Sequence, residues 1–443
     1  MEEVARAATR GSLLDKVKSV AVVDSFSWPV ADPGSALSAA LGIRPCETVR
    51  SARGGVGPLA LIGDAAARVA SGVLDAALVV GAEAMTPYMA AVKAGQETGW
   101  EDPGGEPSRV VGKDRDASHP LETEAGLIAP IFYYPLIEHA HRAAAGRSVD
   151  EHVAWVSSWW SRFSEVAASH PDAWSRSRFT PEEVATAGPS NRLVSSPYRK
   201  VMNANIQVDQ AAAVVVCSAE TAAAAGVPRD EWVFVHGSTG AEDEWFVGER
   251  ASLHRSPAIA AIFEALGRPE VEHLDLYSCF PSAVQTAALE MGLSLDDVTP
   301  TVTGGLAFFG GPANNYTLHS AVTLVDRLRE SPGRGLATAV GWYLTKHHAL
   351  LLGSEPAEFS SHAPSVESAR TTIIEGDVPH ALTESFTALY DRDGTPTMGI
   401  LSAKNDAGRA FGKSHDEEQV RALLDGEAIG RTVRIDGSEY TLP

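Results

Sequence analysis

Apolar and polar positions along the first eighty residues follow a strand–helix–strand order. The apolar run over residues 16–23 predicts a buried strand, because such runs are typical of strands covered on both faces. Apolar residues at helical spacing follow over 62–70, and the run over 76–80 predicts the next strand. Between the first of these strands and the helix lies a glycine-rich turn, Arg53-Gly54-Gly55-Val56-Gly57. This β–α–β order favours a mostly parallel sheet.

The alternation stops between about residues 86 and 200, a stretch that holds most of the tryptophans. Two capping-box patterns predict helix starts there, one at Ser148 with Glu151 and one at Thr180 with Glu183. We expect this stretch to be a helical insertion laid over one end of the sheet.

A second series of apolar runs resembles the first in kind and predicts a duplicated core. Its strands are expected at 209–216, 232–235, 273–277 and 335–340. After residue 355 the pattern changes to short alternating strands separated by the turns Asp393-Gly394, Asp406-Ala407-Gly408 and Asp436-Gly437, with one helix after Ser414. This part, about 364–443, predicts a small separate barrel of the OB type.

Composition narrows the class of protein. A length of 443 residues predicts about three domain-sized units. The formal net charge of −21 argues against general binding to nucleic acid or anionic membranes. Three widely spaced cysteines give neither a disulfide framework nor a metal pattern, which favours a reducing compartment. With no signal peptide and no membrane-length apolar run, a cytoplasmic protein is expected.

Ordered motifs then point to a family. They are the Gly54-Gly55 turn with its helix and the following Gly81-Ala82-Glu83, then Asp209-Gln210-Ala211-Ala212-Ala213, Tyr277-Ser278-Cys279-Phe280, Thr303-Gly304-Gly305 with Gly310-Gly311-Pro312, and Val340-Gly341. In this order they resemble the loops of the thiolase superfamily over residues 1 to about 355. The resemblance implies a duplicated five-layered α-β-α-β-α core, with an N-terminal half over 1–225 and a C-terminal half over 226–355.

A narrower resemblance is to thiolase-like proteins of type 1, which carry an additional C-terminal domain. The stretches that carry it are 275–284, Gly310 to Tyr316, and Thr345-Lys346-His347. Members of this branch are commonly labelled acetyl-CoA acetyltransferases, so the resemblance implies an acyltransferase acting on acyl-CoA thioesters.

The same resemblance locates three substitutions. The family's acylated cysteine falls on Gly55, its G-H-P histidine on Gly311 and its C-x-G cysteine on Val340. Thiolase chemistry needs a thiolate and acid/base partners, so ordinary thiolysis or condensation is not expected here. A helix N-terminus at Gly54–Gly57 could still bind a thioester oxygen or a phosphate; alternatively, these glycines only permit a tight turn.

Eight further residues are candidates for the site. Cys279, His319 and His347 are candidate catalytic groups, and His348 is weighed with them; a buried structural role is the alternative for each. Tyr277 and Asn315 offer polar groups to a carbonyl or phosphate, although Asn315 could instead cap a helix. Arg199 and Lys200 could meet the phosphates of CoA, or form a solvated surface pair.

Three functions therefore remain open. One is an acyltransferase-family enzyme with altered or absent thiolase activity. Another is a non-catalytic acyl-CoA-binding, lipid-binding or partner protein in fatty-acid or steroid metabolism. The third is a subunit that feeds an accessory enzyme, in which the barrel could imitate a separate partner in cis. Acyl-CoA or CoA is the expected ligand, with no cofactor and no metal, and the chain is expected to be a monomer or homodimer.

The N-terminal stretch adds one expectation. Met1 to Ala8 predicts a helix, whereas the thiolase half-fold opens with a strand that we expect at the centre of its sheet. Loss of a central strand would leave two unpaired edges. We therefore expect either an upstream start in the natural protein or poor stability.

Overall fold

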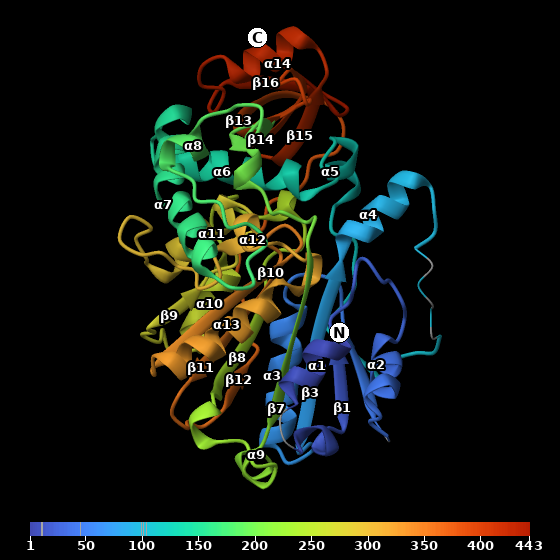
Figure 1. Cartoon of the computed structure of the whole chain (residues 1–443). Helices are drawn as coiled ribbons and strands as arrows, with labels where there is room; N and C mark the ends of the chain where they lie inside the picture. Colours follow the sequence, from blue (N-terminus) through green and yellow to red (C-terminus); the bar gives the residue numbers. More distant parts are fainter. Residues whose placement is uncertain (10–11, 45, 99, 101, 103) are drawn as a thin grey trace.

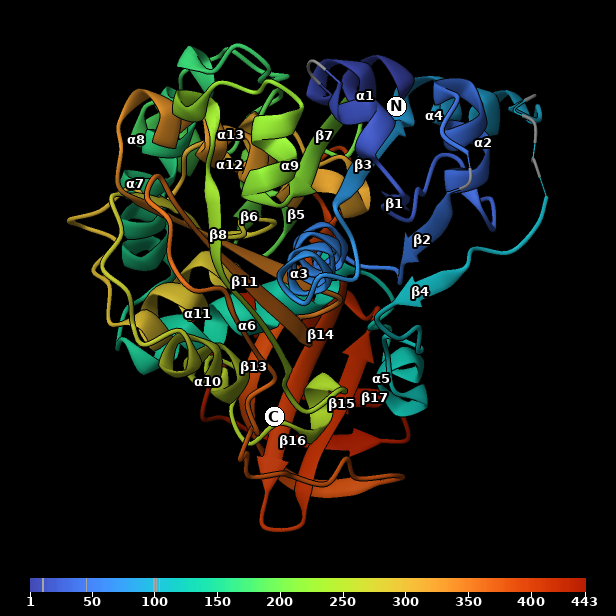
Figure 2. The same ribbon diagram turned by 90° about the horizontal axis from the view of Figure 1, so that it is seen from below.

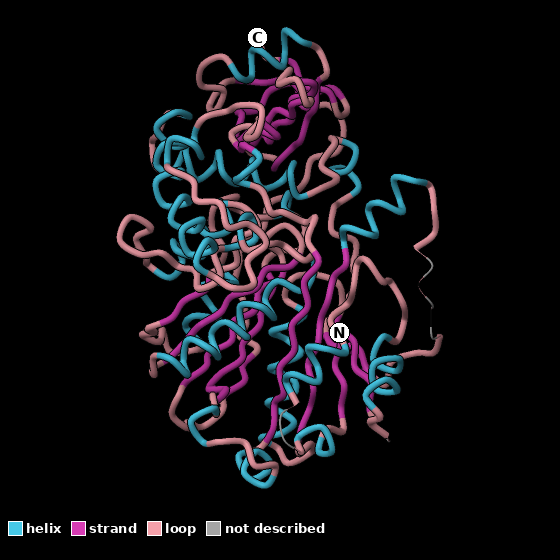
Figure 3. Tube along the Cα trace, viewed as in Figure 1, coloured by secondary structure: helices cyan, strands magenta, loops and turns pink. Residues whose placement is uncertain are grey.

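The computed structural model describes residues 1–9, 12–44, 46–98, 100, 102 and 104–443. Its strands form two five-stranded core sheets and a third sheet near the C-terminus (Figure 1). Figure 3 shows the strands of the third sheet gathered at one end of the molecule, away from the two core sheets.

The first core sheet has the strand order β4-β2-β1-β3-β7. Its strands are β1 (Ser19–Val22), β2 (Glu47–Ser51), β3 (Ala76–Ala84), β4 (Arg109–Val111) and β7 (Asp209–Cys217). β1 lies parallel to β2 and β3, and β7 is antiparallel to β3. The predicted strands over 16–23, 76–80 and 209–216 are confirmed, and so is the parallel character of the first β–α–β unit.

The N-terminal residues form helix α1 (Glu2–Ala8), as predicted, and a 3₁₀ turn over Leu13–Lys16. Among the described residues, no strand precedes β1. β1 pairs directly with strands on both sides, so the expectation of an unpaired gap at the centre of the sheet is wrong.

The second core sheet has the order β12-β8-β11-β10-β9. Its strands are β8 (Phe234–Glu242), β9 (His273–Asp275), β10 (Arg334–Gly341), β11 (Lys346–Gly353) and β12 (Ser360–His362). β10 is parallel to β9, and β11 is antiparallel to both β10 and β8. This arrangement repeats that of the first sheet, where β3 is parallel to β1 and antiparallel to β7.

Two helices, α3 (Gly57–Ala70) and α13 (Tyr316–Glu330), pack against each other and against strands of both core sheets. Outer helices cover the other faces: α1 and α2 (Pro33–Leu41) on the first sheet, and α10 (Pro257–Ala265) on the second (Figures 1 and 2). The core therefore has helix, sheet, helix, sheet and helix layers, as expected for the duplicated α/β fold.

The insertion is mainly helical. Its helices are α4 (Met85–Ala94), α5 (Pro120–Glu124), α6 (Pro130–Ala144), α7 (Val149–Ser169) and α8 (Pro181–Ala185). Ser148 caps α7 and Thr180 caps α8, each in a full capping box, which confirms both predicted helix starts. Further helices are α9 (Ala219–Ala224), α11 (Pro281–Met291) and α12 (Gly305–Phe308).

The C-terminal strands close into a five-stranded barrel. They are β13 (Val378–Tyr390), β14 (Pro396–Asn405), β15 (Gly408–Ser414), β16 (Thr432–Asp436) and β17 (Glu439–Thr441). The order around the barrel is β13-β14-β15-β17-β16, with β15 parallel to β17 and with α14 (Glu417–Leu424) between β15 and β16. This is the five-stranded Greek-key arrangement of an OB barrel. Two short insertion strands, β5 (Leu193–Ser195) and β6 (Tyr198–Arg199), extend it beyond β13.

Helix α6 of the insertion packs on β13 of the barrel, so the insertion lies between the barrel and the core (Figure 1). None of the described helices has the length and apolar character needed to cross a membrane.

Candidate functional site

The predicted glycine turn joins β2 to α3. Gly54 has a φ of +124°, a conformation that favours glycine, and its N–H donates to Oδ1 of Asn314 at 3.0 Å. The N–H of Gly57 then donates to the carbonyl of Gly54 at 3.0 Å and begins the helix. A buried side chain from the second half of the core therefore fixes the turn of the first half.

The space beside Gly55 is occupied by the second half. A Cβ at residue 55 would lie 2.5 Å from the carbonyl oxygen of Val340 and 2.7 Å from the hydroxyl of Tyr277. Real Cβ atoms essentially never approach other atoms this closely, so any side chain here would require Tyr277 or strand β10 to move. The structure thus brings Gly54, Gly55, Tyr277 and Val340 together.

Little open space remains next to this contact. The cavity there has a volume of about 10 Å³, which is the size needed for one water molecule. It is lined by Ile259, Ile262, Phe263, Tyr277, Ala283, Ala287, Thr338, Ala339, Val340, His347, His348 and Ala349. An acyl group does not fit this space as it stands.

Cys279 is buried two residues before the start of α11. Burial raises the pKa of its thiol to about 12, and a hydrogen bond with Tyr134 offsets only part of this increase. The thiol is therefore protonated at neutral pH, and a protonated thiol is a poor nucleophile. The ring of Tyr134 stacks on Phe280 with centroids 4.5 Å apart, so aromatic rings pack beside the thiol.

His319 lies on α13, as expected, and its Nε2 is 3.4 Å from Nδ2 of Asn315. Burial lowers the pKa of His319 to about 3, so the ring is neutral at pH 7. Asn315 makes no side-chain capping bond to α13, so the capping alternative is wrong. Its Oδ1 is buried without a partner and lies 1.8 Å from where a Cβ at Gly81 would be.

His347 belongs to a buried cluster at the start of β11. Its Nε2 lies 3.0 Å from Oδ2 of Asp243 and 3.5 Å from the hydroxyl of Ser256. A serine–histidine–aspartate relay needs the serine and the aspartate on opposite ring nitrogens, whereas here both contact Nε2. Ser256 also caps α10 by accepting the N–H of Ile259. The cluster fits a structural role.

Three predicted residues have no described contact with the turn. Gly311 lies in the loop before α13, where its N–H donates to the carbonyl of Asn205 at 2.8 Å. Arg199 lies on β6 beside the barrel, donates to the carbonyl of Pro197, and has its pKa lowered by burial. Lys200 follows on the exposed surface.

Lys346 and Asn314 belong to the site but were not among the predicted site residues. Nζ of Lys346 donates to the carbonyl of Arg53 at 2.5 Å and lies over the ring of Trp342. Burial lowers the pKa of Lys346. Asn314 links the turn to Asp24, whose backbone carbonyl accepts from Nδ2 at 2.9 Å. In the sequence, only the polar runs Thr345-Lys346-His347 and Asn314-Asn315 could have indicated these two site residues.

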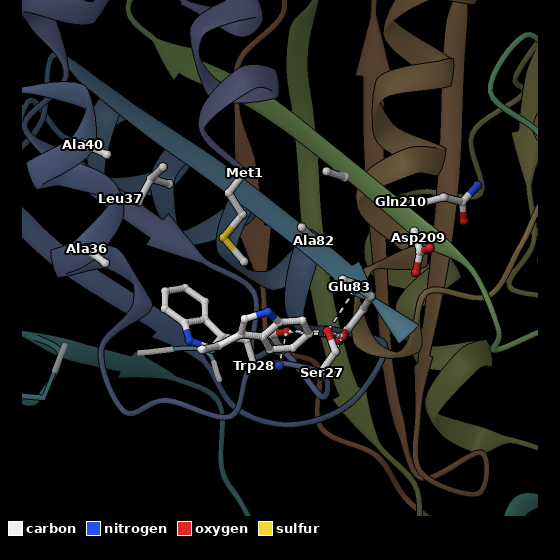
Figure 4. Close-up of a pocket in the computed structure, with 14 residues that line it drawn as sticks. Met1, Ser27, Trp28, Ala36, Leu37, Ala40, Ala82, Glu83, Asp209 and Gln210 are labelled. Carbon is white, nitrogen blue, oxygen red and sulfur yellow. Dashed lines mark hydrogen bonds between the residues drawn. The ribbon is translucent and has the colours of Figure 1, made fainter. Parts of the chain in front are cut away.

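A cavity of about 830 Å³ opens at the C-terminal end of β3 (Figure 4). It is lined by Met1, Ser25, Ser27, Trp28, Ala36, Leu37, Ala40, Ala82, Glu83, Ala84, Trp100, Asp209, Gln210 and Ala211. Glu83 accepts hydrogen bonds from the N–H groups of Phe26 and Ser27 and from the Ser27 hydroxyl. Burial nevertheless raises the pKa of this carboxyl. In the sequence, Glu83 belonged to the motif Gly81-Ala82-Glu83 and was not predicted as a site residue.

Within the described part of the chain, no cluster of three or more His, Cys, Asp or Glu side chains could hold a metal ion.

Comparison with known proteins identifies the C-terminal region. Residues 362–439 match the family model "thiolase-like protein type 1 additional C-terminal domain". Among curated proteins no sequence matches the chain.

Solved structures resemble the fold, and two of them are described here. A monomeric SCP2-thiolase-like protein type 1 from Mycobacterium smegmatis is 27% identical, with a TM-score of 0.82 over 98% of this chain and 91% of that chain. The dimeric peroxisomal thiolase of Saccharomyces cerevisiae is 15% identical, with a TM-score of 0.54 over 80% of this chain and 90% of that chain. The chain therefore has the thiolase fold, and its C-terminal region matches the additional domain of thiolase-like proteins of type 1.

Proposed function

We propose that this protein binds acyl-CoA or CoA without carrying out the thiolase reaction. The observation that carries the proposal is the contact at Gly55, where the carbonyl of Val340 and the hydroxyl of Tyr277 occupy the place of a side chain. The resemblance assigns the acylated cysteine to this position. A chain with no thiol there and no space for one cannot form the acyl-enzyme that the reaction needs.

Features around the turn support binding of an anionic ligand. Helix α3 begins at Gly57 and directs its N-terminal dipole toward the turn. Arg53 precedes the turn with its side chain about half exposed, and Lys346 adds a second cation beside it. These cations are suited to the phosphates of CoA, despite the net charge of the chain. The cavity beside β3 has the volume and apolar lining to take an acyl chain or another lipid.

We infer that the protein acts in fatty-acid or steroid metabolism as a cytoplasmic binding or partner protein. The neighbour from Mycobacterium smegmatis is described as monomeric, so we propose a monomer here too. The alternative, an acyltransferase with altered chemistry, would need Cys279 as nucleophile, and the raised pKa of that thiol weighs against it.

Calorimetric titration of the full chain with CoA and with acetyl-CoA tests the proposal. We expect binding of both ligands, weakened about tenfold by Arg53→Ala because one charge-assisted hydrogen bond to a phosphate is lost. The matched control is Arg434→Ala, an exposed arginine on the barrel, which should leave binding unchanged. Absence of heat with both ligands would contradict the proposal, and so would formation of acetoacetyl-CoA from acetyl-CoA.

A further inference from the structure

A lysine amine lies directly beside the glycine turn. Lys346 is the first residue of β11, and only 5% of its surface is exposed. A Cβ at Gly54 would lie 3.2 Å from its Nζ, and a Cβ at Gly341 would lie 2.8 Å from its Cε. These two glycines therefore leave room for the lysine chain. They place its amine one residue before Gly55, the position that the resemblance assigns to the acylated cysteine.

The amine has few partners for a positive charge. Nζ donates one hydrogen bond, to the carbonyl of Arg53, and makes no ion pair with any described residue. An ammonium has three N–H groups and is costly to bury without an anionic partner. Burial accordingly lowers the pKa of Lys346, against the opposing charges of Asp114 and Glu242. More of this amine is therefore unprotonated at neutral pH than in an exposed lysine, and the unprotonated amine is the nucleophilic form.

The amine is close to the surface of the molecule. Its hydrogen bond to Arg53 is only partly buried, and Arg53 itself is exposed. A molecule bound over the turn has to displace a single hydrogen bond to contact Nζ. It does not have to enter the small cavity beside Tyr277, because Lys346 does not line that cavity.

A hydrogen-bond donor without a partner lies beside the amine. Trp342 has a φ of +57°, which is strained for a bulky residue, and its ring centroid is 5.6 Å from Nζ of Lys346. The indole Nε1 is buried and has no hydrogen-bond partner among the described residues. A carbonyl group on Nζ and one hydrogen bond together span about 5 Å. The indole N–H is therefore within reach of an acyl group carried by the lysine.

We propose that Lys346 accepts acyl groups from acyl-CoA thioesters and that the N–H of Trp342 binds the carbonyl of the acylated lysine. The unprotonated Nζ attacks the carbonyl carbon of the thioester, a C–N bond forms and the C–S bond breaks. The attacking nitrogen loses one proton, and CoA leaves as the thiol with that proton. The product is an amide, so the acyl group stays on the protein. This inference rests on the proposed binding of acyl-CoA.

Peptide mapping by mass spectrometry, after incubation of the full chain with acetyl-CoA, tests this inference. We expect an acetyl group on Lys346 that survives hydroxylamine, which cleaves thioesters but not amides. It should form at least about tenfold faster than on Lys93, an exposed lysine of α4, because binding holds the thioester beside the amine. Lys346→Arg should abolish this fast acetylation. The rate at Lys346 should rise with pH to a midpoint below about 10.4, the ordinary value for lysine.

Two tryptophan variants test the role of the indole N–H. Trp342→Phe keeps an aromatic ring and removes the N–H, so acetylation of Lys346 should slow about fivefold. The matched control is Trp174→Phe, at an exposed position of the insertion, which should leave the rate unchanged. Equal rates for both variants would overturn the role of Trp342. If Trp342→Phe does not fold, the rate at Lys346 in the unmodified chain still decides whether the lysine is an acyl acceptor.

Calorimetric titration with CoA, which carries no acyl group, separates this inference from the proposed function. Binding of CoA with acetylation of Lys346 no faster than that of Lys93 would overturn the inference and leave the proposed function standing. Absence of CoA binding together with slow acetylation of Lys346 would overturn both.

Discussion

At the scale of single residues, the account depends on how completely the space beside Gly55 is filled. A substitution by cysteine would place Cβ within 3 Å of Val340 and Tyr277, atoms held by strand β10 and by a buried ring. A thiol at position 55 therefore does not fit the packing of this site.

We predict that Gly55→Cys lowers the free energy of unfolding by about 1–3 kcal/mol, as overpacked core positions do. The matched control is Gly188→Ala, because no atom lies within 4 Å of a Cβ at residue 188; its stability should change by less than about 0.5 kcal/mol. Denaturant unfolding measures both. A Gly55→Cys protein as stable as the parent would show that the space is open.

The contact of Gly55 with Tyr277 and Val340 shows which parts of the site the sequence could predict. The glycine turn, the placement of Gly55 and the neighbourhood of Tyr277 were accessible from ordered motifs. That Tyr277 fills the space was not, because the contact joins residues more than 200 positions apart and depends on side-chain packing. For the same reason the motif Thr345-Lys346-His347 could not show that Lys346 reaches Arg53 across the two halves.

At the scale of elements, helices and strands were predicted mainly from local sequence patterns. Both capping boxes start helices at Ser148 and Thr180 because their hydrogen bonds lie within four residues. The order of strands in a sheet depends instead on long-range pairing. The sequence therefore could not show that β1 pairs with both β2 and β3, or that β7 rather than the sheet centre has an unpaired edge.

Ser148→Ala tests the cap of α7. The hydroxyl accepts the N–H of Glu151, and its loss should cost about 1 kcal/mol of stability. Ser158→Ala, on the exposed side of the same helix, should change the stability by less than about 0.5 kcal/mol. Equal thermal shifts for the two variants would contradict a capping role.

At the scale of the whole molecule, buried ions attach the barrel to the core. Arg409 on β15 is fully buried, makes two hydrogen bonds to Glu384 at 2.7 and 2.8 Å, and donates to the backbone carbonyls of Val247, Gly248 and Arg250. Arg142 of α6, in the insertion, makes two hydrogen bonds to Glu427 of the barrel, whose side chain is half exposed. The barrel is therefore held to the core by hydrogen bonds from Arg409 to backbone carbonyls, and to the insertion by an ion pair.

We predict that Arg409→Met destabilises the protein by about 3–5 kcal/mol, because three carbonyls lose their donor and Glu384 keeps only its contacts with Ser402 and Lys404. The control Arg434→Met removes an exposed pair with Asp436 and should cost at most about 1 kcal/mol. Calorimetric melting compares them. A barrel that docks without this pair would give similar melting temperatures for both variants.

Buried histidines predict how stability depends on pH. Burial lowers the pKa of His141 and of His319 to about 3 and that of His348 to about 4, against about 6.5 in an unfolded chain. Below pH 6.5 the unfolded state therefore binds more protons, and the folded state loses up to about 1.4 kcal/mol per group for each pH unit. Burial also raises the pKa of Glu83 and Asp275. These carboxyls take up protons more readily in the folded state, so their protonation at low pH partly offsets the loss of stability caused by the histidines.

Denaturant unfolding at pH 7.5, 6.0 and 5.0 measures this dependence. For these three histidines together we expect a loss of about 2 kcal/mol between pH 7.5 and 6.0 and a further, larger loss at pH 5.0. Stability that is unchanged or higher at pH 5.0 would show that these histidines are accessible to protons in the folded state.

The most direct test of the central claim is the intact mass of the full chain after incubation with acetyl-CoA, before and after treatment with hydroxylamine, which cleaves thioesters. We predict no hydroxylamine-sensitive acetyl adduct, because Gly55 carries no thiol and the thiol of Cys279 is protonated. A stoichiometric adduct that hydroxylamine removes, located on Cys279, would contradict the account and show that the protein forms an acyl-enzyme.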